Sequence, residues 1–246
     1  MIKAVYFDLD DTLYDQLQPF RLAVENTGLI GHAIGSLHIE DLYKSIRRHS
    51  DLLWVKHVNG EMTLEELRIK RTTSAFSDIG IEVSAEAAAL LQWNYELEQS
   101  RLTLREGVQE LFEQLQASGI GIGLITNGPV EHQMKKIIAL ELLKWVAEPN
   151  AYISDGIGIA KPDPDVFHFV RKNVALRPEQ LVYVGDAWHN DIAPSFQAGW
   201  TPIWLNTRQQ QPNKKDGFVK YLECGSIEEV MPLLRKLNER ETGCLL

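Results

Sequence analysis

The chain has 246 residues, of which 44% are hydrophobic and 24% charged, and its formal net charge at pH 7 is -9. This composition is typical of a globular protein with one large core, or with a core and a smaller second domain. The acidic balance argues against a nucleic-acid partner, because such binding depends on Lys and Arg meeting phosphates. No apolar stretch approaches the length of a membrane span and no signal-peptide pattern precedes the first strand, so we expect a cytoplasmic protein without a membrane partner.

The first predicted strand ends in a cluster of acidic side chains. An apolar, β-branched and aromatic run from Ile2 to Phe7 indicates a buried strand, and Asp8-Leu9-Asp10-Asp11-Thr12 follows it. Residues two apart on an extended chain share a face, so the side chains of Asp8 and Asp10 project together. Two adjacent carboxylates repel unless a cation lies between them or one is protonated, and both conditions suit phosphoryl transfer. A polar turn after a strand is the alternative interpretation.

The next ninety residues or so carry helical periodicity. Helices are predicted to begin near Leu17, Ile39, Thr63 and Ser84, and Thr63-Leu64-Glu65-Glu66 fits a capping box. Residues 28–35, 59–60 and 79–83 are the expected connections. This pattern predicts an all-helical bundle inserted after the first strand.

From Gly107 onward, helices and strands alternate. The alternation predicts parallel strands with right-handed crossovers, that is, a doubly wound, Rossmann-like α/β core whose ligands bind beyond the carboxyl ends of the strands. The last helix is expected to start with a capping box made by Ser226 and Glu229. The expected helices are 108–118, 130–143, one starting at Asp163-Pro164, 192–198 and 227–238, and the expected strands are 120–125, 151–154, 181–184 and 201–205.

Polar side chains stand at the ends of these strands. Asp8 and Asp10 end the first strand, Thr126-Asn127-Gly128 the second, and Gly185-Asp186 a later one, while Lys161 lies in a loop just before a helix start. Because the carboxyl ends of parallel strands meet at one edge of a sheet, we expect these groups to gather there. Each has an ordinary alternative: Lys161 as a surface lysine, Asn127-Gly128 as a turn and Asp191 as a helix cap.

The ordered set of motifs, from Asp8-Leu9-Asp10-Asp11-Thr12 through Thr126-Asn127 and Lys161-Pro162 to Gly185-Asp186 with Asn190-Asp191, resembles the haloacid dehalogenase-like superfamily of hydrolases. The resemblance covers the whole chain in outline, because that family carries a helical cap directly after the first motif. It implies a catalytic core of residues 1–14 and 104–246 and a cap of residues 15–103. Looser similarities point to the bacterial pyrimidine nucleotidase and N-acylneuraminate phosphatase branches.

The resemblance implies catalytic and substrate-binding roles for five residues. Asp8 would attack phosphorus and form an aspartyl-phosphate, and Asp10 would protonate the leaving oxygen and then deprotonate the attacking water. Thr126 and the backbone of Asn127 would hold phosphate oxygens. Lys161 would neutralise charge on the nucleophile and on the transferred group, which makes it both a catalytic and a substrate-binding candidate.

The resemblance also implies a metal site with two supporting residues. Asp8, Asp186 and the carbonyl of Asp10 would bind Mg²⁺, a hard ion suited to oxygen ligands. Asp191 would orient Lys161 or a metal-bound water, and Thr12 would fix Asp10.

The predicted function is therefore Mg-dependent hydrolysis of a small phosphomonoester, a nucleotide or a sugar phosphate, through an aspartyl-phosphate. A phosphomutase, a haloacid dehalogenase and a non-catalytic binding domain on the same fold are the alternatives. Asp10 argues against a dehalogenase, because halide leaves without a proton. The partner is expected to be a small phosphorylated metabolite, the sequence does not indicate an oligomeric state, and Trp54 and Lys56 are candidates for substrate contacts from the cap.

Overall fold

A computed structural model describes residues 1–29 and 36–242. The chain divides into two compact units, each with its own core. Unit 1 comprises Met1–Asp15 and Thr103–Leu246, and unit 2 comprises Gln16–Leu102. The second unit is thus inserted into the first, just after the opening strand.

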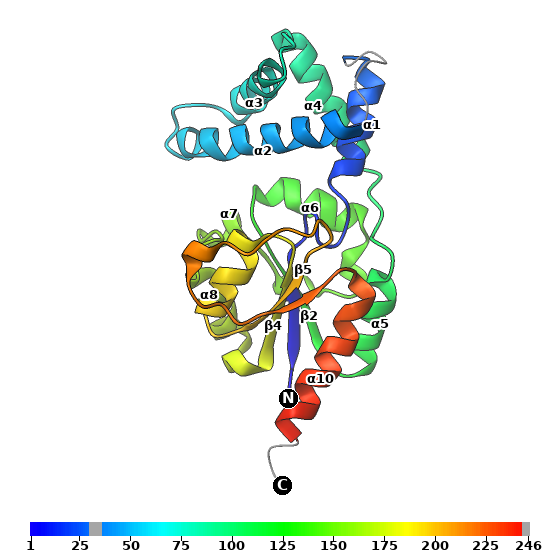
Figure 1. Cartoon of the computed structure of the whole chain (residues 1–246), viewed down its shortest axis with the longest axis vertical. Coiled ribbons are helices and arrows are strands. Elements are labelled where there is room, and N and C mark those ends of the chain that lie inside the picture. The colour runs from blue at the N-terminus through cyan, green and yellow to red at the C-terminus, as the bar shows by residue number, and fades with distance from the viewer. Residues whose placement is uncertain (30–35, 243–246) are drawn as a thin grey trace. The chain divides into compact units, whose positions relative to one another are not determined.

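Unit 1 is built on a parallel sheet, in which the described strands have the order β3-β2-β1-β4-β5-β6 (Figure 1). Every pairing in it is parallel. The chain moves outward from β1 in one direction and then outward from β4 in the other, so the order reverses between β1 and β4. Doubly wound sheets bind their ligands at this kind of position. The strands are β1 (Ala4–Phe7), β2 (Gly121–Thr126), β3 (Ala151–Ile153), β4 (Leu181–Gly185), β5 (Thr201–Leu205) and β6 (Leu222–Cys224).

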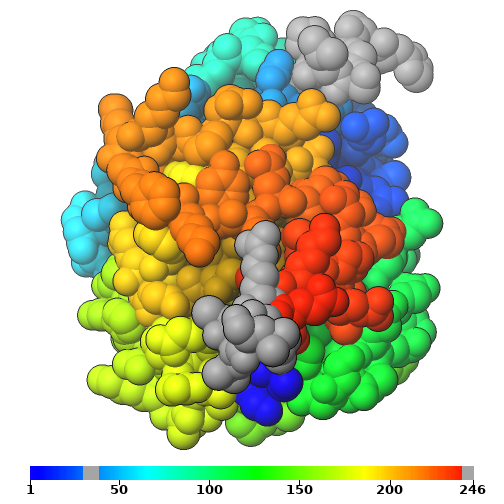
Figure 2. Space-filling view, turned by 60° about the horizontal axis from the view of Figure 1, so that its bottom comes forward, coloured from blue at the N-terminus to red at the C-terminus, as the bar shows by residue number. Residues whose placement is uncertain are grey.

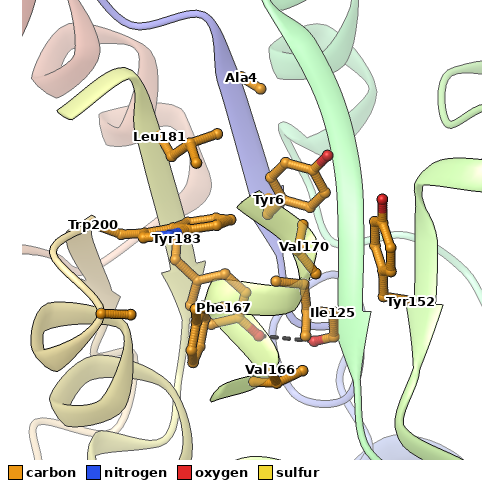
Figure 3. Close-up of a cluster of buried hydrophobic side chains, with 11 residues drawn as sticks. Ala4, Tyr6, Ile125, Tyr152, Val166, Phe167, Val170, Leu181, Tyr183 and Trp200 are labelled. Atoms are coloured by element: carbon orange, nitrogen blue, oxygen red, sulfur yellow. Dashed lines mark hydrogen bonds between the residues drawn. The ribbon is translucent and has the colours of Figure 1, made fainter. Parts of the chain in front are cut away.

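Both faces of the sheet are covered by helices. Tyr6 points into a buried cluster that contains Phe167 of helix α8, and the Tyr183 hydroxyl in this cluster donates to the carbonyl of Ile125 at 2.8 Å (Figure 3). The next residue on β1, Phe7, has its ring 5.1 Å from that of Phe112 in helix α5. Successive side chains of β1 therefore enter different cores, which explains why the strand reads as a continuous apolar run.

The helices of unit 1 follow the strands in alternation. Helices α5 and α10 lie side by side in Figure 1 and are in contact with each other. The connection between β5 and β6 forms a broad part of the surface in Figure 2, where it is orange. The α-helices are α5 (Val108–Ala117), α6 (Val130–Ala139), α7 (Ser154–Ile157), α8 (Asp165–Val174), α9 (Ala193–Gln197) and α10 (Val230–Thr242). A π-helical turn, Trp188–Ile192, precedes α9, and short 3-10 turns lie at Leu142–Lys144, Glu148–Asn150, Pro178–Gln180, Lys214–Asp216 and Ile227–Glu229.

Unit 2 is helical throughout its described residues. Its helices are α1 (Leu17–Thr27), α2 (Ser36–Val58), α3 (Leu64–Asp78) and α4 (Ala85–Gln99). They share a core that includes Phe20, Leu42, Phe76 and Leu91. The predicted capping box is formed, because the Thr63 hydroxyl accepts from the Glu66 N–H at 3.2 Å and the Glu66 carboxylate accepts from the Thr63 N–H at 2.8 Å. The predicted connection at residues 28–35 lies mostly outside the described residues.

Three local predictions are wrong. The helix expected over 130–143 ends at Ala139 and gives way to a 3-10 turn. Ser226 does not cap the final helix through its side chain, which starts instead as a 3-10 turn. Strand β6 was not expected, because its three residues carry too short a pattern to read without the neighbouring strand β5.

No helix among the described residues is both long enough and apolar enough to cross a membrane.

Candidate active site

Four strand ends place the predicted site residues at one edge of the sheet. Asp8 directly follows β1, Thr126 is the last residue of β2, and Asp186 directly follows β4. Lys161 comes from the connection between β3 and α8. Since β1 has β2 on one side and β4 on the other, the two flanking loops open beside Asp8.

Lys161 connects the buried carboxylates of this edge. Its Nζ lies 2.6 Å from Asp8 Oδ1 and 2.7 Å from Asp191 Oδ1, and it donates to the Tyr183 hydroxyl at 2.8 Å. Only 3% of the lysine side chain is exposed, so these ion pairs are sheltered from solvent. Burial alone would lower the pKa of Lys161, but the charges of Asp191 and Asp8 outweigh it and hold that pKa above its ordinary value. The lysine is therefore a permanent cation beside Asp8.

Asp8 carries negative charge in an environment that resists it. Burial raises the pKa of its carboxyl to about 7, with Lys161 opposing the rise and Asp191 and Asp10 adding to it. The carboxylates of Asp8, Asp186 and Asp191 each offer an oxygen within 4.8 Å of the others, and Lys161 is the lysine that pairs with two of them. Three carboxylates against one ammonium leave an excess of negative charge that a divalent cation would balance. The donor set consists of oxygens alone, which fits a hard metal ion.

The backbone around β4 holds Asp191 in this cluster. The Ala187 N–H donates to Asp191 Oδ2 at 2.9 Å, and the Asp191 N–H donates back to the Ala187 carbonyl at 2.8 Å. A Cβ on Gly185 would lie 2.5 Å from the Asp191 carboxyl carbon. Only glycine therefore fits at the end of β4 while Asp191 keeps its contact with Lys161.

Asp10 lies among three side chains that sequence reasoning did not select. Its Oδ1 accepts from the Tyr14 hydroxyl and, at 2.7 Å, from Lys136 Nζ, and its Oδ2 accepts from Gln133 Nε2 at 2.9 Å. Burial favours the neutral acid, yet Lys136 and these hydrogen bonds hold the pKa of Asp10 well below its usual range. The only sequence signal for the missed residues was their place on α6, where Gln133 and Lys136 share one helical stripe with the buried Ile137.

Asn127 and Thr12 are in the site, with contacts other than those expected. The Asn127 side chain accepts from the Lys161 N–H at 2.9 Å and donates to the Lys161 carbonyl at 2.7 Å, so it fixes the backbone that carries the lysine. The Thr12 hydroxyl donates to Asp186 Oδ1 at 3.3 Å, whereas a bond to Asp10 was predicted. The reason is geometric: the turn after β1 carries Thr12 toward the end of β4, while Asp10 faces α6.

Asp11 occupies the turn itself. Its φ of 61° is in the left-handed region, which Asp tolerates better than most residues. The Asp11 carbonyl accepts from Arg105 at 2.9 Å, and its carboxylate accepts from Arg208 at 3.1 Å. The two arginines tie the turn to the start of α5 and to the loop after β5.

Comparison with known proteins agrees with this geometry. The family model of haloacid dehalogenase-like hydrolases matches residues 2–199, a span that includes every candidate residue described above. The chain belongs to this family of hydrolases.

Individual relatives of this haloacid dehalogenase-like hydrolase are distant but match over their full lengths. It is 26% identical to glyceraldehyde 3-phosphate phosphatase of Methanopyrus kandleri, covering 96% of this chain and 99% of the relative. It is 25% identical to phosphoglycolate phosphatase of Escherichia coli strain K12, covering 95% and 92%. Among solved structures, L-2-haloacid dehalogenase of Xanthobacter autotrophicus has the same fold with a TM-score of 0.68, at 15% identity and with coverage of 96% and 99%.

Proposed function

We propose that this hydrolase is a magnesium-dependent phosphatase that cleaves small phosphomonoesters through an aspartyl-phosphate on Asp8. The observation that carries the proposal is the carboxylate of Asp8 at the end of β1, 2.6 Å from the buried ammonium of Lys161 and beside a second carboxylate, Asp10, with a separate set of partners. The relatives named above are phosphatases of small phosphorylated metabolites by their names, and this supports the choice of reaction.

In the first step an Asp8 oxygen attacks phosphorus and the bond from phosphorus to the ester oxygen breaks. The departing oxygen takes a proton from Asp10. In the second step Asp10 takes a proton from water, whose oxygen attacks the same phosphorus and releases phosphate and free Asp8. Lys161 offsets the charge on the transferred group, and the Thr126 hydroxyl and the Asn127 backbone hold its oxygens.

Asp10 is ionised in the arrangement described, since Lys136 favours its charged form. The ionised carboxylate suits the second step, in which it acts as a base. For the first step it must hold a proton. The negative charge of a bound phosphomonoester opposes the effect of Lys136 and raises the pKa of Asp10, so substrate itself favours the acid form.

The carboxylates of Asp8, Asp186 and Asp191 are the side chains that would hold Mg²⁺, and the carbonyl of Asp10 is a further candidate. A bound divalent ion supplies positive charge to the phosphoryl oxygens. The magnesium identity rests on the preference of this ion for carboxylate oxygens. Thr12 would then act by holding Asp186, and Asp191 by holding Lys161.

Unit 2 is proposed to act as the cap that selects the substrate. Trp54 stands near the end of α2, where its ring centroid lies 5.1 Å from that of His57, and Lys56 is exposed on the same helix. Both remain candidates for contact with the organic part of the ester. Nucleotides and sugar phosphates are the proposed substrate classes.

Phosphate release from a panel of phosphorylated metabolites in Mg²⁺ tests the proposal, with Asp8→Asn as the inactive control. Halide release from 2-chloropropionate tests the dehalogenase alternative in the same samples. The elaborate set of donors around Asp10 disfavours that alternative, because a halide needs no proton. Halide release without phosphate release would refute the phosphatase proposal. Transfer of the phosphoryl group to a sugar hydroxyl in place of water would identify a mutase.

A further inference from the structure

The side-chain amide of Gln133 joins two groups that the proposed reaction uses separately. Its Nε2 lies 2.9 Å from Asp10 Oδ2 and 2.6 Å from Thr126 Oγ1. Only 1% of Gln133 is exposed, so water does not compete for these bonds. An ionised carboxylate can only accept hydrogen bonds, and Asp10 therefore fixes which end of the amide faces the site. The NH₂ group, with its two hydrogens, must point at Asp10 and at Thr126.

This orientation determines what Thr126 can do. The amide nitrogen of Gln133 is a donor only, so the bond between the two residues places the hydrogen on Gln133 and makes Thr126 Oγ1 the acceptor. The hydroxyl hydrogen of Thr126 is left to bond with a different acceptor. Thr126 is the last residue of β2, at the sheet edge where Asp8 also ends its strand. A phosphoryl oxygen attacked by Asp8 is the acceptor that this hydrogen suits.

Lys136 completes the arrangement from the same helix. It lies three residues after Gln133 on α6, with 4% of its side chain exposed, and its Nζ is 2.7 Å from Asp10 Oδ1. Gln133 and Lys136 thus bind different oxygens of one carboxylate. Two fixed contacts on opposite oxygens restrict rotation of the carboxyl group in a way that one contact does not.

We propose that Gln133 and Lys136 are positioning residues for phosphoryl transfer. Gln133 turns the Thr126 hydroxyl into a donor for a phosphoryl oxygen and, together with Lys136, aims the Asp10 carboxylate at the leaving oxygen. The assignment rests on the proposed phosphatase function and deepens it by naming two residues that touch no substrate.

The two contacts of Gln133 serve different substrates, and this makes the proposal measurable. Every phosphomonoester presents the same phosphoryl oxygens, so the contact with Thr126 affects all esters. Only an ester with a poor leaving group needs a proton from Asp10. 4-Nitrophenyl phosphate therefore reports on the contact with Thr126 alone, whereas glycerol 3-phosphate reports on both contacts.

The experiment measures kcat and KM for these two esters in Mg²⁺. Lys136→Met should lower kcat for glycerol 3-phosphate at least about tenfold more than kcat for 4-nitrophenyl phosphate. Gln133→Met should lower both values, again more strongly for glycerol 3-phosphate. The ratio of the two rates does not depend on the folded fraction of a variant, so a partly unfolded sample still gives an answer. Lys135→Met, which removes an exposed lysine next to Lys136 on the same helix, is the matched control and should leave the ratio unchanged.

A double mutant tests whether Gln133 acts through Thr126. If it does, adding Gln133→Met to Thr126→Val should lower kcat for 4-nitrophenyl phosphate by less than about twofold beyond Thr126→Val alone, because the hydroxyl to be oriented is already gone. Losses that multiply in the double mutant, or an unchanged rate ratio in Lys136→Met, would overturn the assignment while leaving the phosphatase intact. A wild-type protein that hydrolyses neither ester nor any member of the metabolite panel would refute the proposed function itself.

Discussion

Replacing Asp8 with asparagine separates the catalytic role of this residue from its electrostatic effect on folding. The change keeps the shape of the side chain and an oxygen that can accept from Lys161, but it removes the nucleophile and one negative charge. We expect kcat for any phosphomonoester to fall at least about a hundredfold, with no acyl-phosphate formed. We also expect the metal-free protein to become more stable.

The size of the stability gain follows from the buried carboxylates. Burial raises the pKa of Asp8 from 3.8 to about 7, and such a rise corresponds to roughly 4 kcal/mol against the ionised form in the folded protein. Because the folded protein binds this proton more tightly than the unfolded chain, the contribution of Asp8 to stability is lost as the pH rises from about 4 to about 7. The amide must still be buried, so we expect about half of this energy, ~2 kcal/mol, to be recovered at pH 7. For a chain of this size that is a rise in Tm of about 4 to 8 °C.

Calorimetry in EDTA at pH 5 and pH 7 measures this effect, with Asp155→Asn, at an exposed carboxylate of unit 1, as the control. The gain in Tm for Asp8→Asn should be larger at pH 7. Added Mg²⁺ should stabilise the wild type more than the variant, because the variant lacks a proposed ligand. A metal-free Asp8→Asn protein that unfolds at a lower temperature than the wild type at pH 7 would refute the electrostatic argument. Retained turnover would refute the nucleophile assignment.

Three other predictions concern the metal, the end of β4 and unit 2. Calcium in place of magnesium should inhibit, because it accepts bidentate carboxylates and higher coordination numbers and so can occupy both oxygens of the nucleophile; full turnover in Ca²⁺ alone would contradict this. Gly185→Ala should lower kcat at least about tenfold, since its Cβ would displace Asp191, whereas Gly121→Ala, whose Cβ meets its nearest neighbour at 3.4 Å, should be nearly silent; equal kinetics for the two variants would argue against a steric role for Gly185. Thr63→Ala should destabilise unit 2 by about 1 kcal/mol through loss of the cap of α3, measured by thermal unfolding, and an unchanged unfolding temperature would show that the cap does not contribute.

The elements of this protein follow largely from local sequence patterns. The apolar run before Asp8, the alternation of strands and helices after Gly107 and the capping box of Thr63 depend on residues close together in the chain, and the structure contains all three. Local patterns failed where the element was short or the contact distant. The three-residue strand β6 exists because β5 lies beside it, and Ser226 is followed by a 3-10 turn in place of the predicted cap.

The placement of Asp8 and Lys161 could also be anticipated, because both lie at strand or loop ends and the carboxyl ends of parallel strands share one edge. The partners of Asp10 could not. Gln133 and Lys136 are more than 120 residues away along the chain, and on α6 they look like ordinary polar positions of an amphipathic helix. Only packing of that helix against the end of β1 turns their side chains inward. The sequence alone thus determined which reactive groups meet at the sheet edge, whereas tertiary packing decided which neighbours orient them, since hydrogen-bond partners depend on side-chain positions that no local pattern specifies.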